Sequence, residues 1–192
     1  MLKRNALVFL LAASLPLAVH AGDSYTVDPP HTFAHFTISH LGFSTMHGRF
    51  DKSSGKVTLD RVAKNGTIDI AIESGSVSTG YAKRDDHLKS PDFFNAVEFP
   101  NIAYKSSAIK FKGDAPVSVE GNLTLLGVAK PVTLTITEFS CGTDPMDPLK
   151  KKQKCGAGAI AQIKRSDFGM KSFLPAVGDD IKLEFEIEAY KD

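Results

Sequence analysis

The side chains in this sequence best suited to chemistry are histidines, and the first question is whether they bind a metal ion. After residue 21 they are His31, His35, His40, His47 and His87. On a strand, His31 and His35 would share a face, but four residues of strand span about 13 Å, too far for one ion with bonds of about 2 Å. A metal site would need ligands from neighbouring strands. We favour surface histidines with one buried, hydrogen-bonded histidine at His40, and predict no metal.

Two glycine-rich strings resemble known motifs, but neither has the surroundings that such a motif needs. Residues 75–80, GSVSTG, have the wrong spacing for the strained turn that presents a catalytic serine in hydrolases. Residues 156–161, GAGAIA, match part of a dinucleotide-binding fingerprint, but no strand-helix-strand unit surrounds them. The sequence therefore predicts a protein that is not an enzyme and has no cofactor.

The two cysteines, Cys141 and Cys155, enclose a loop rich in turn-forming residues, GTDPMDPLKKKQK. Their spacing differs from C-x-x-C and no histidine lies nearby, which disfavours a redox pair or a metal site. In an oxidising compartment the pair predicts a disulfide that closes this loop and contributes about 3 kcal/mol in the chain-entropy model.

Residues 1–21 have the layout of a secretory signal peptide, with a basic start, an apolar run that ends at Val19 and small residues up to Ala21. We expect cleavage after Ala21, which leaves residues 22–192 as one domain with a substantial core. The apolar run is shorter than the roughly 20 residues of a membrane-spanning helix. With a net charge of +1, nothing in the composition indicates nucleic-acid binding.

The elements that must position these side chains begin with residues 32–50, where apolar and polar side chains alternate. A period of two is typical of a strand with one dry and one wet face. His40 falls on the dry side, and after a bend that face continues through Met46 and Phe50. Gly48 has the same parity, and a glycine among large apolar residues predicts open space in front of it. The pattern thus predicts a lined cavity.

Most of the later chain repeats this alternation, and residues 78–95 are the exception. Strands are expected at 25–27, 57–59, 67–73, 102–104, 117–125, 132–136, 157–163 and 181–187. In residues 78–95, Thr79 can cap a helix, and residues 90–92 begin a second short helical turn that presents Phe93 and Phe94.

Antiparallel strands with short connections form a sheet whose edges disappear when it closes into a barrel. The fold class is therefore all-β, an eight-stranded antiparallel barrel with one helical crossover, and a flattened sandwich is the alternative. The chain has 13 Phe and no Trp, and an ordinary core explains any single Phe. The wall from Ala157 to Ala161 presents only small inward side chains, however, and with Gly48 it predicts an under-filled interior that suits an apolar ligand.

A series of motifs follows along the chain. They are F-x-I-x-H-L-G-x-S-x-M-x-G-x-F over 36–50, R-D-x-H-L-x-S-x-D-F-F over 84–94, F-P at 99–100, G-x-L-T-L-x-G-V-x-K-P-V over 121–132 and D-F-G-M over 167–170. The series resembles the YceI-like family of periplasmic polyisoprenoid-binding proteins over essentially all of residues 22–192. The resemblance implies a lipocalin-like barrel with an elongated apolar pocket for an isoprenoid or similar long-chain lipid.

The same resemblance, together with inward parity, gives candidate site residues. The ligand-binding candidates are Phe36, Ile38, His40, Met46, Phe50, Leu88, Phe93, Phe94, Leu123, Leu125, Phe168, Phe173 and Phe185. The head-group candidates, by position alone, are Arg84, His87 and Lys130. The gate is expected at the loop 168–178 or at the Phe93/Phe94 turn.

The function implied is that of a periplasmic binding or carrier protein for an isoprenoid lipid or quinone, exchanged by transient contact with a membrane surface. The sequence leaves the oligomeric state and the ligand's head group open. One alternative is a secreted structural or adhesion domain with a filled barrel. Another is a lipid-modifying enzyme, which would need a base and a nucleophile at the pocket mouth.

Overall fold

The structure is a computed structural model that describes residues 22–192. The predicted signal peptide, residues 1–21, lies outside the described residues. Between residues 22 and 192, no helix combines the length and the apolar character needed to cross a membrane.

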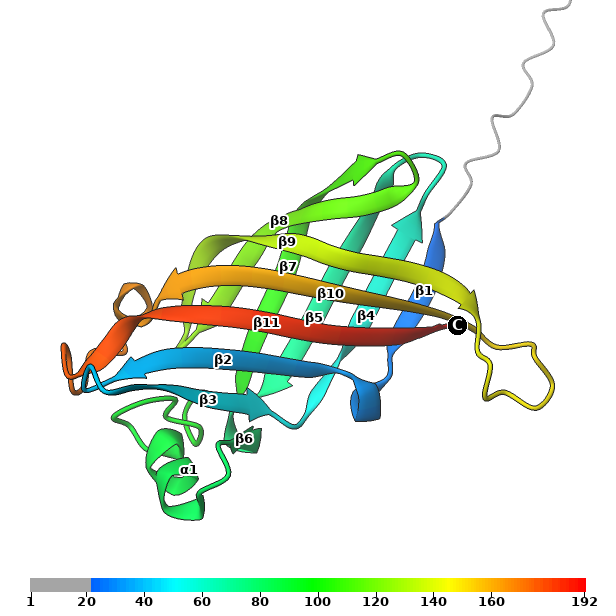
Figure 1. Cartoon of the computed structure of the whole chain (residues 1–192). Helices are drawn as coiled ribbons and strands as arrows, with labels where there is room; N and C mark the ends of the chain where they lie inside the picture. Colours follow the sequence, from blue (N-terminus) through cyan, green and yellow to red (C-terminus); the bar gives the residue numbers. More distant parts are fainter. Residues whose placement is uncertain (1–21) are drawn as a thin grey trace, which may run out of the picture.

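The described chain is mostly β-strand with one α-helix (Figure 1). In chain order the strands are β1 (Asp23–Val27), β2 (Phe33–His40), β3 (Ser44–Phe50), β4 (Ser53–Asp60), β5 (Asn65–Glu73), β6 (Val77–Ser78), β7 (Asn101–Lys112), β8 (Ala115–Leu125), β9 (Val128–Thr143), β10 (Gln153–Lys164) and β11 (Val177–Lys191). The helix is α1 (Ala82–Lys89), and the short 3-10 turns are η1 (Pro29–His31), η2 (Ser74–Ser76) and η3 (Arg165–Phe168).

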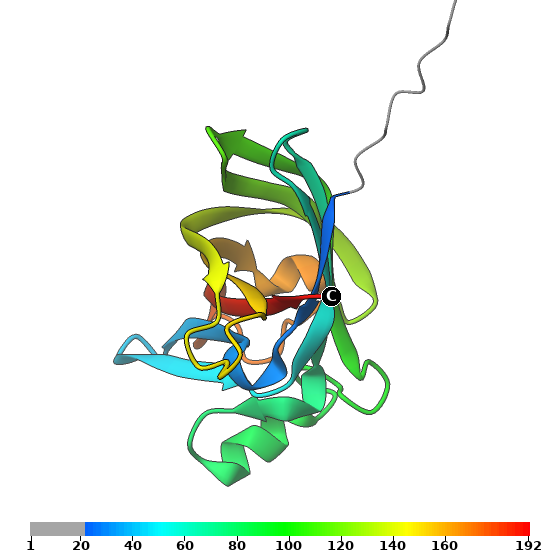
Figure 2. The ribbon, with the colours of Figure 1, turned by 90° about the vertical axis from the view of Figure 1, so that its right-hand side faces the viewer.

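The sheet closes into an eight-stranded antiparallel barrel, which confirms the predicted fold class. Neighbouring strands follow the order β1-β4-β5-β7-β8-β9-β10-β11, and β11 pairs back with β1 to complete the cylinder. In Figure 2 the strands enclose a common centre and α1 lies outside the wall. Closure pairs the backbone groups that an open sheet would leave at its edges.

The strand pairing in the barrel wall changes where η1 bends the chain between β1 and β2. β1 pairs with β4 and β2 pairs with β3, so that each pair of strands forms half of one long, bent hairpin. β11 runs along both β1 and β2. On the other side of β3, the described strands offer only β6 as a partner, through Arg49 and Phe50. The crossover that contains α1 lies beside this part of the wall (Figure 1).

The helical crossover is shorter than the sequence predicts. α1 begins after Tyr81, and Thr79 is not its cap. Instead, the Thr79 N–H donates to Asp85 Oδ1 at 2.9 Å, and the Thr79 hydroxyl accepts a hydrogen bond from Arg84 Nε at 2.7 Å. Residues 90–95 form turns and not a second helical turn. The proline in this segment restricts the residue before it to extended backbone, which ends the helix.

Tyr104 of β7 shows how the core accommodates a polar group. Its ring covers Gly121, where a Cβ atom would come within 2.7 Å of the ring. Its hydroxyl lies 3.0 Å from the carbonyl oxygens of both Val119 and Val132 and can donate to either. Burial raises the pKa of Tyr104 to about 12. Gly121 therefore marks close packing.

The predicted disulfide between Cys141 and Cys155 is present. The two residues lie directly opposite each other on β9 and β10, so the bond ties together the strand ends that flank the loop 144–152. Tyr190 of β11 also anchors this loop, because its hydroxyl donates to Asp144 Oδ2 at 2.6 Å.

Candidate functional site

Two apolar cavities lie inside the barrel. The outer cavity has a volume of about 320 Å³ and is bounded by β2, β3, the α1 crossover and the start of β11. The inner cavity has a volume of about 110 Å³ and is bounded by strands of the closed cylinder. Both cavities contact one shared layer of apolar side chains. These are Ala34, Ile72, Leu123, Leu183 and Phe185.

The small-residue wall predicted on β10 borders the inner cavity. Gly156, Ala157 and Ala159 line this cavity, and Ala159 is buried. The β11 partners of Ala157 and Ala159 are the larger Ile187 and Phe185, which line the same cavity, whereas Ala161 at the end of the predicted wall lines neither cavity. The expected under-filled interior is therefore present.

Gly48 does not contribute open space, contrary to the sequence prediction. A Cβ atom there would come within 2.3 Å of the Phe36 ring, which lies across the glycine from the neighbouring strand. Gly48 thus provides room for the Phe36 side chain. The distinction could not be made from parity alone, because parity places both residues on the inner face without saying which fills the space.

An aromatic cluster of Phe36, Phe50 and Phe94 forms the wall of the outer cavity near the crossover. The ring centroids of Phe50 and Phe94 are 5.1 Å apart, and Phe36 lies 5.8 Å from Phe50 and 6.3 Å from Phe94. Tilted and edge-to-face contacts at these distances are favourable for aromatic pairs. The cluster joins β2 and β3 to the turn after α1, and thereby holds the crossover against the barrel.

Arg84 and His87 of α1 both line the outer cavity. The Arg84 guanidinium donates to the Thr79 hydroxyl at 2.7 Å and to the Thr79 carbonyl oxygen at 2.8 Å. His87 Nε2 lies 3.0 Å from Asp92 Oδ2. The His87 ring meets Phe93 and Phe173 edge-on, with centroids 5.1 and 5.5 Å away. Two of the three head-group candidates are thus held at the cavity wall.

Arg165 of η3 lines the same cavity and was missed by the sequence reasoning. Its side chain is only 1% exposed and donates to the carbonyl oxygens of Met170, Ser172, Val177 and Gly178, at 2.7 to 3.1 Å. Burial lowers the pKa of this guanidinium, and the Asp179 carboxylate opposes that shift. Arg165 therefore organises the loop that leads into β11. The only signal in the sequence was a basic residue just before the D-F-G-M motif.

The ionisable groups that line the outer cavity are all basic. The ionisable residues that line it are His35, His40, His47, Arg84, His87 and Arg165, and none of the lining residues is Asp or Glu. The inner cavity is lined by no residue that is charged at neutral pH. The interior therefore has one end lined by basic groups and one apolar end.

His40 differs from the expected buried and hydrogen-bonded histidine. It is half-buried at the end of β2, lines the outer cavity, and its imidazole makes no hydrogen bond to the described residues. His35 and His47, expected at the surface, also border this cavity. The interpretation of His40 fails because β2 ends at the rim of the barrel, where an inward side chain still reaches water.

The structure brings together most of the predicted site residues around the outer cavity. Those that line it are Phe36, Ile38, His40, Met46, Phe50, Arg84, His87, Leu88, Phe93, Phe94, Leu123, Leu125, Phe173 and Phe185. Two candidates lie elsewhere. Phe168 is 2% exposed within the packed core and lines neither cavity, because η3 turns its ring into the cluster around Met170. Lys130 is exposed near the start of β9 and also lines neither cavity.

A possible cation site at the barrel seam is already filled by a lysine. Asp28, His31 and Glu188 place ligand atoms within 4.8 Å of one another. The Lys154 ammonium contacts Glu188 and lies 3.3 Å from Asp28. Burial works to lower the pKa of Lys154, but bonds to Glu188, Tyr190 and Asp28 raise it overall. A metal ion would have to displace this ammonium, so the cluster is an ion-pair network.

Comparison with known proteins gives consistent matches along the chain. Residues 25–189 match the model of the YceI-like domain. A UPF0312 protein of Shewanella denitrificans is 34% identical over 195 residues, covering 99% of this chain and 100% of the relative. Protein YceI of Salmonella arizonae is 35% identical over 193 residues, covering 97% of each chain.

Solved structures share the fold. The YCEI protein of Campylobacter jejuni superimposes with a TM-score of 0.67 at 28% identity, covering 80% of this chain and 90% of that one. A polyisoprenoid binding domain from Saccharophagus degradans has a TM-score of 0.65 at 17% identity, covering 88% and 98% of the two chains, and supports the fold alone. Together, the match over residues 25–189 and the full-length relatives show that the chain belongs to the YceI-like family.

Proposed function

We propose that this protein binds an isoprenoid lipid, a polyprenyl chain or an isoprenoid quinone, inside the barrel and carries it through the periplasm. The observation that carries the proposal is the pair of apolar cavities that share one layer of side chains. These cavities disfavour a structural or adhesion domain with a filled barrel. The name of the Saccharophagus degradans domain, polyisoprenoid binding, agrees with the proposal.

The periplasmic location is part of the proposal. The predicted signal peptide supports export, and the Cys141–Cys155 bond suits an oxidising compartment. Processing at Ala21 would release residues 22–192 as the carrier, a cleavage that N-terminal sequencing of the exported protein would detect.

Transfer from a membrane explains how such a carrier releases its ligand. Transfer of a methylene group from water into an apolar cavity is favourable by about 0.8 kcal/mol. For a long tail, the summed transfer free energy would exceed the roughly 20 kcal/mol ceiling of non-covalent affinity. A tail that moves from a bilayer into an apolar cavity is dry at both ends, and the net transfer term is near zero. Affinity then depends on fit and on head-group contacts, and exchange stays reversible.

The polarity of the interior gives the ligand an orientation. The tail would occupy the inner cavity beside Ala159, and the head would lie in the outer cavity near Arg84 and His87. A head that accepts hydrogen bonds suits this end, because its ionisable groups are guanidinium and imidazole. Lys130 has no part in this arrangement.

The gate we propose is the loop 171–176. Phe173 in this loop stacks on Phe93 with centroids 5.7 Å apart and is 52% exposed. Arg165 holds the two ends of the loop through the carbonyl oxygens of Met170 and Val177. Arg165 also binds the Ser172 carbonyl oxygen, so the backbone is held beside Phe173, and the gate would open by a swing of the Phe173 side chain away from Phe93 while the barrel stays intact.

Native mass spectrometry of freshly purified protein tests this function. We expect an added mass that lipid extraction identifies as an isoprenoid, and we expect Phe94→Asp to abolish it because a carboxylate cannot be buried in this wall. Ile160→Asp, on the outer face of β10, is the matched control and should keep the lipid. Circular dichroism establishes that each variant folds, and Phe173→Asp, at a half-exposed position, provides a second variant. Equal lipid content in all variants would refute this pocket.

A further inference from the structure

Three large apolar side chains are exposed beside the mouth of the outer cavity. Phe43 is 91% exposed and Leu41 is 52% exposed in the turn between β2 and β3, and Phe173 is 52% exposed in the loop before β11. The Leu41 N–H donates to the Ala176 carbonyl oxygen at 2.7 Å, which joins the turn to the loop. The three side chains therefore belong to one connected rim.

Folding does not explain the residue types in this rim. Leu41 and Phe173 have positive φ angles of 55° and 63°, where glycine or asparagine would be less strained. Leu126, with φ of 52°, compensates by packing against the core, whereas about half of each side chain of Leu41 and Phe173 is exposed, although Phe173 also stacks on Phe93. An unfavourable backbone combined with an exposed apolar side chain indicates a role outside the fold.

The two chain segments that carry the rim contain no acidic residue. Between residues 32 and 50, and again between 168 and 178, the sequence has no Asp or Glu. Lys171 is exposed in the second segment. The acidic residues that follow it have partners, since Asp179 accepts hydrogen bonds from Ser166, and Asp180 lies 3.0 Å from Lys164. Asp92 of the neighbouring crossover is paired with His87, the ring that contacts Phe173. The rim segments thus combine apolar tips with the positive charge of Lys171.

We propose that Leu41, Phe43, Lys171 and Phe173 form a docking edge that inserts into the surface of an anionic phospholipid bilayer. Large apolar side chains next to basic ones favour the interface of such a bilayer. The docking edge borders the outer cavity, because Phe173 and His40, the residue before Leu41, both line it. Docking there would place the cavity mouth against the membrane, and this consequence rests on the proposed lipid-carrier function.

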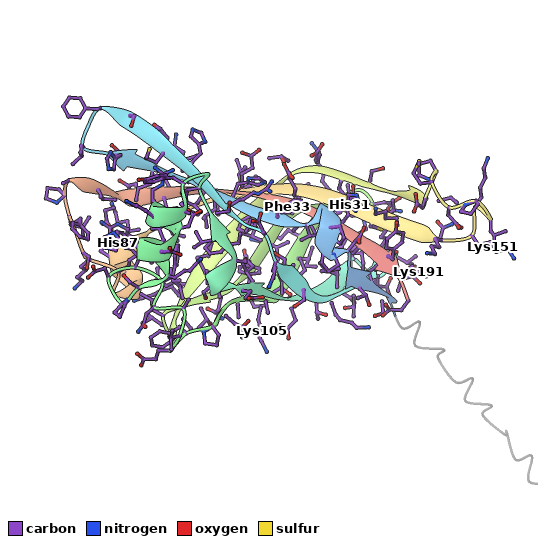
Figure 3. All side chains as sticks on the ribbon, turned by 90° about the horizontal axis from the view of Figure 1, so that it is seen from below. His31, Phe33, His87, Lys105, Lys151 and Lys191 are labelled. Atoms are coloured by element: carbon purple, nitrogen blue, oxygen red, sulfur yellow. A yellow bond between two sulfur atoms is a disulfide. The ribbon has the colours of Figure 1, made fainter. Side chains whose placement is uncertain are left out.

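The main rival within the chain is the disulfide loop, which also combines exposed apolar side chains with lysines. Met146 is 85% exposed and Leu149 is 70% exposed there. Figure 3 shows Lys151 of this loop at the end of the molecule opposite the β2–β3 hairpin. The loop also contains Asp144 and Asp147, and it lies away from the outer cavity. We therefore assign docking to the other end.

Vesicle co-sedimentation tests the docking edge. The purified protein should bind vesicles of phosphatidylglycerol mixed with phosphatidylcholine, and bind more weakly in high salt or with phosphatidylcholine alone. Phe43→Ser should weaken binding about tenfold, and Lys171→Gln about fivefold. Met146→Ser, and Val62→Ser at an 88% exposed position in the β4–β5 turn, should leave binding unchanged.

Several results would overturn the assignment. Absence of vesicle binding by the unaltered protein would do so, as would a loss caused by Met146→Ser but not by Phe43→Ser. Self-association that Phe43→Ser abolishes, seen by sedimentation velocity without vesicle binding, would instead assign the rim to a second copy of the chain. Phe43→Ser should keep its co-purified lipid and Phe94→Asp should keep vesicle binding, so that docking and lipid carriage fail separately.

Discussion

The two ends of the barrel interior differ in how their walls are made. The inner cavity is enclosed by strands paired on both sides, and its lining carries no group that is charged at neutral pH. The outer cavity lies where β3 has only the short strand β6 as its partner on one side. There, the α1 crossover and the loop before β11 complete the wall. Continuous strands suit a fixed apolar slot, whereas loops and a short helix can present guanidinium and imidazole groups and can move.

This difference predicts separate effects at the two ends. Changes at the outer end should alter access to the ligand and the order of the loop, while changes at the inner end should alter which tail fits. The predictions below run from the largest expected effect on stability to the smallest.

Replacing the buried guanidinium should affect the outer end most. Arg165→Met leaves the carbonyl oxygens of the loop before β11 without donors, and we expect a loss of about 4 kcal/mol in the free energy of unfolding. Arg165→Lys, which keeps the charge but not the fork of donors, should lose less. Urea denaturation measures both, and a loss below about 1 kcal/mol for Arg165→Met would contradict its anchoring role.

Removing the disulfide should destabilise the inner end of the barrel, where Cys155 lines the inner cavity, without emptying the outer cavity. The double variant Cys141→Ser, Cys155→Ser should be about 3 kcal/mol less stable because its unfolded chain is less restricted. Thermal unfolding with and without reductant measures the effect, since reduction should lower the melting temperature of the unaltered protein and not of the variant. A variant that folds but loses all bound lipid would show that the two ends are not separate.

Filling the inner cavity should change ligand choice more than stability. Ala159→Leu places a larger side chain in that cavity, where packing cost and added apolar burial partly offset each other, for a net change of about 1 kcal/mol. We expect the variant to retain shorter chains than the unaltered protein, as measured by mass spectrometry of extracted lipids. Gln162→Leu, at an exposed position of the same strand, is the control. An unchanged lipid profile in Ala159→Leu would separate the inner cavity from the binding site.

Tyr104 should make the inner end sensitive to alkali. Its pKa is raised to about 12 by burial, so the unfolded chain loses this proton first as the pH rises. Its contribution to stability is present below pH 10 and should be lost between about pH 10 and 12. Tyr104→Phe should cost about 1 kcal/mol at neutral pH and remove this part of the alkaline loss, measured by denaturation at several pH values. The same loss of unfolding free energy at alkaline pH in the unaltered protein and in Tyr104→Phe would argue against this role of Tyr104.

The barrel could be predicted from the sequence because a period of two is a strong local signal. Eight strands with short connections leave few arrangements other than closure. The alternation in β2 and β3 also predicts the inward positions of Phe36, Ile38, Met46 and Phe50, all of which line the outer cavity. The disulfide could be predicted for a similar reason, because two cysteines in a chain with a predicted signal peptide have one intramolecular pairing.

The predictions that were wrong or missing concern contacts between distant segments. Gly48 and Phe36 have the same parity, and only the register of β2 with β3 shows that one fills the space left by the other. Lys130 belongs to a matching motif, yet it lies outside both cavities near the exposed start of β9. Arg165 binds carbonyl oxygens five to thirteen residues away in a loop without a repeating pattern. No local signal indicates such a contact.

A crystal structure of the protein with its co-purified lipid tests the central claim most directly. We predict continuous density that begins beside Arg84 and His87, passes the shared layer at Phe185 and ends next to Ala159. Density for a head group beside Ala159, or an interior closed by protein side chains while the lipid sits on the outer surface, would contradict the account.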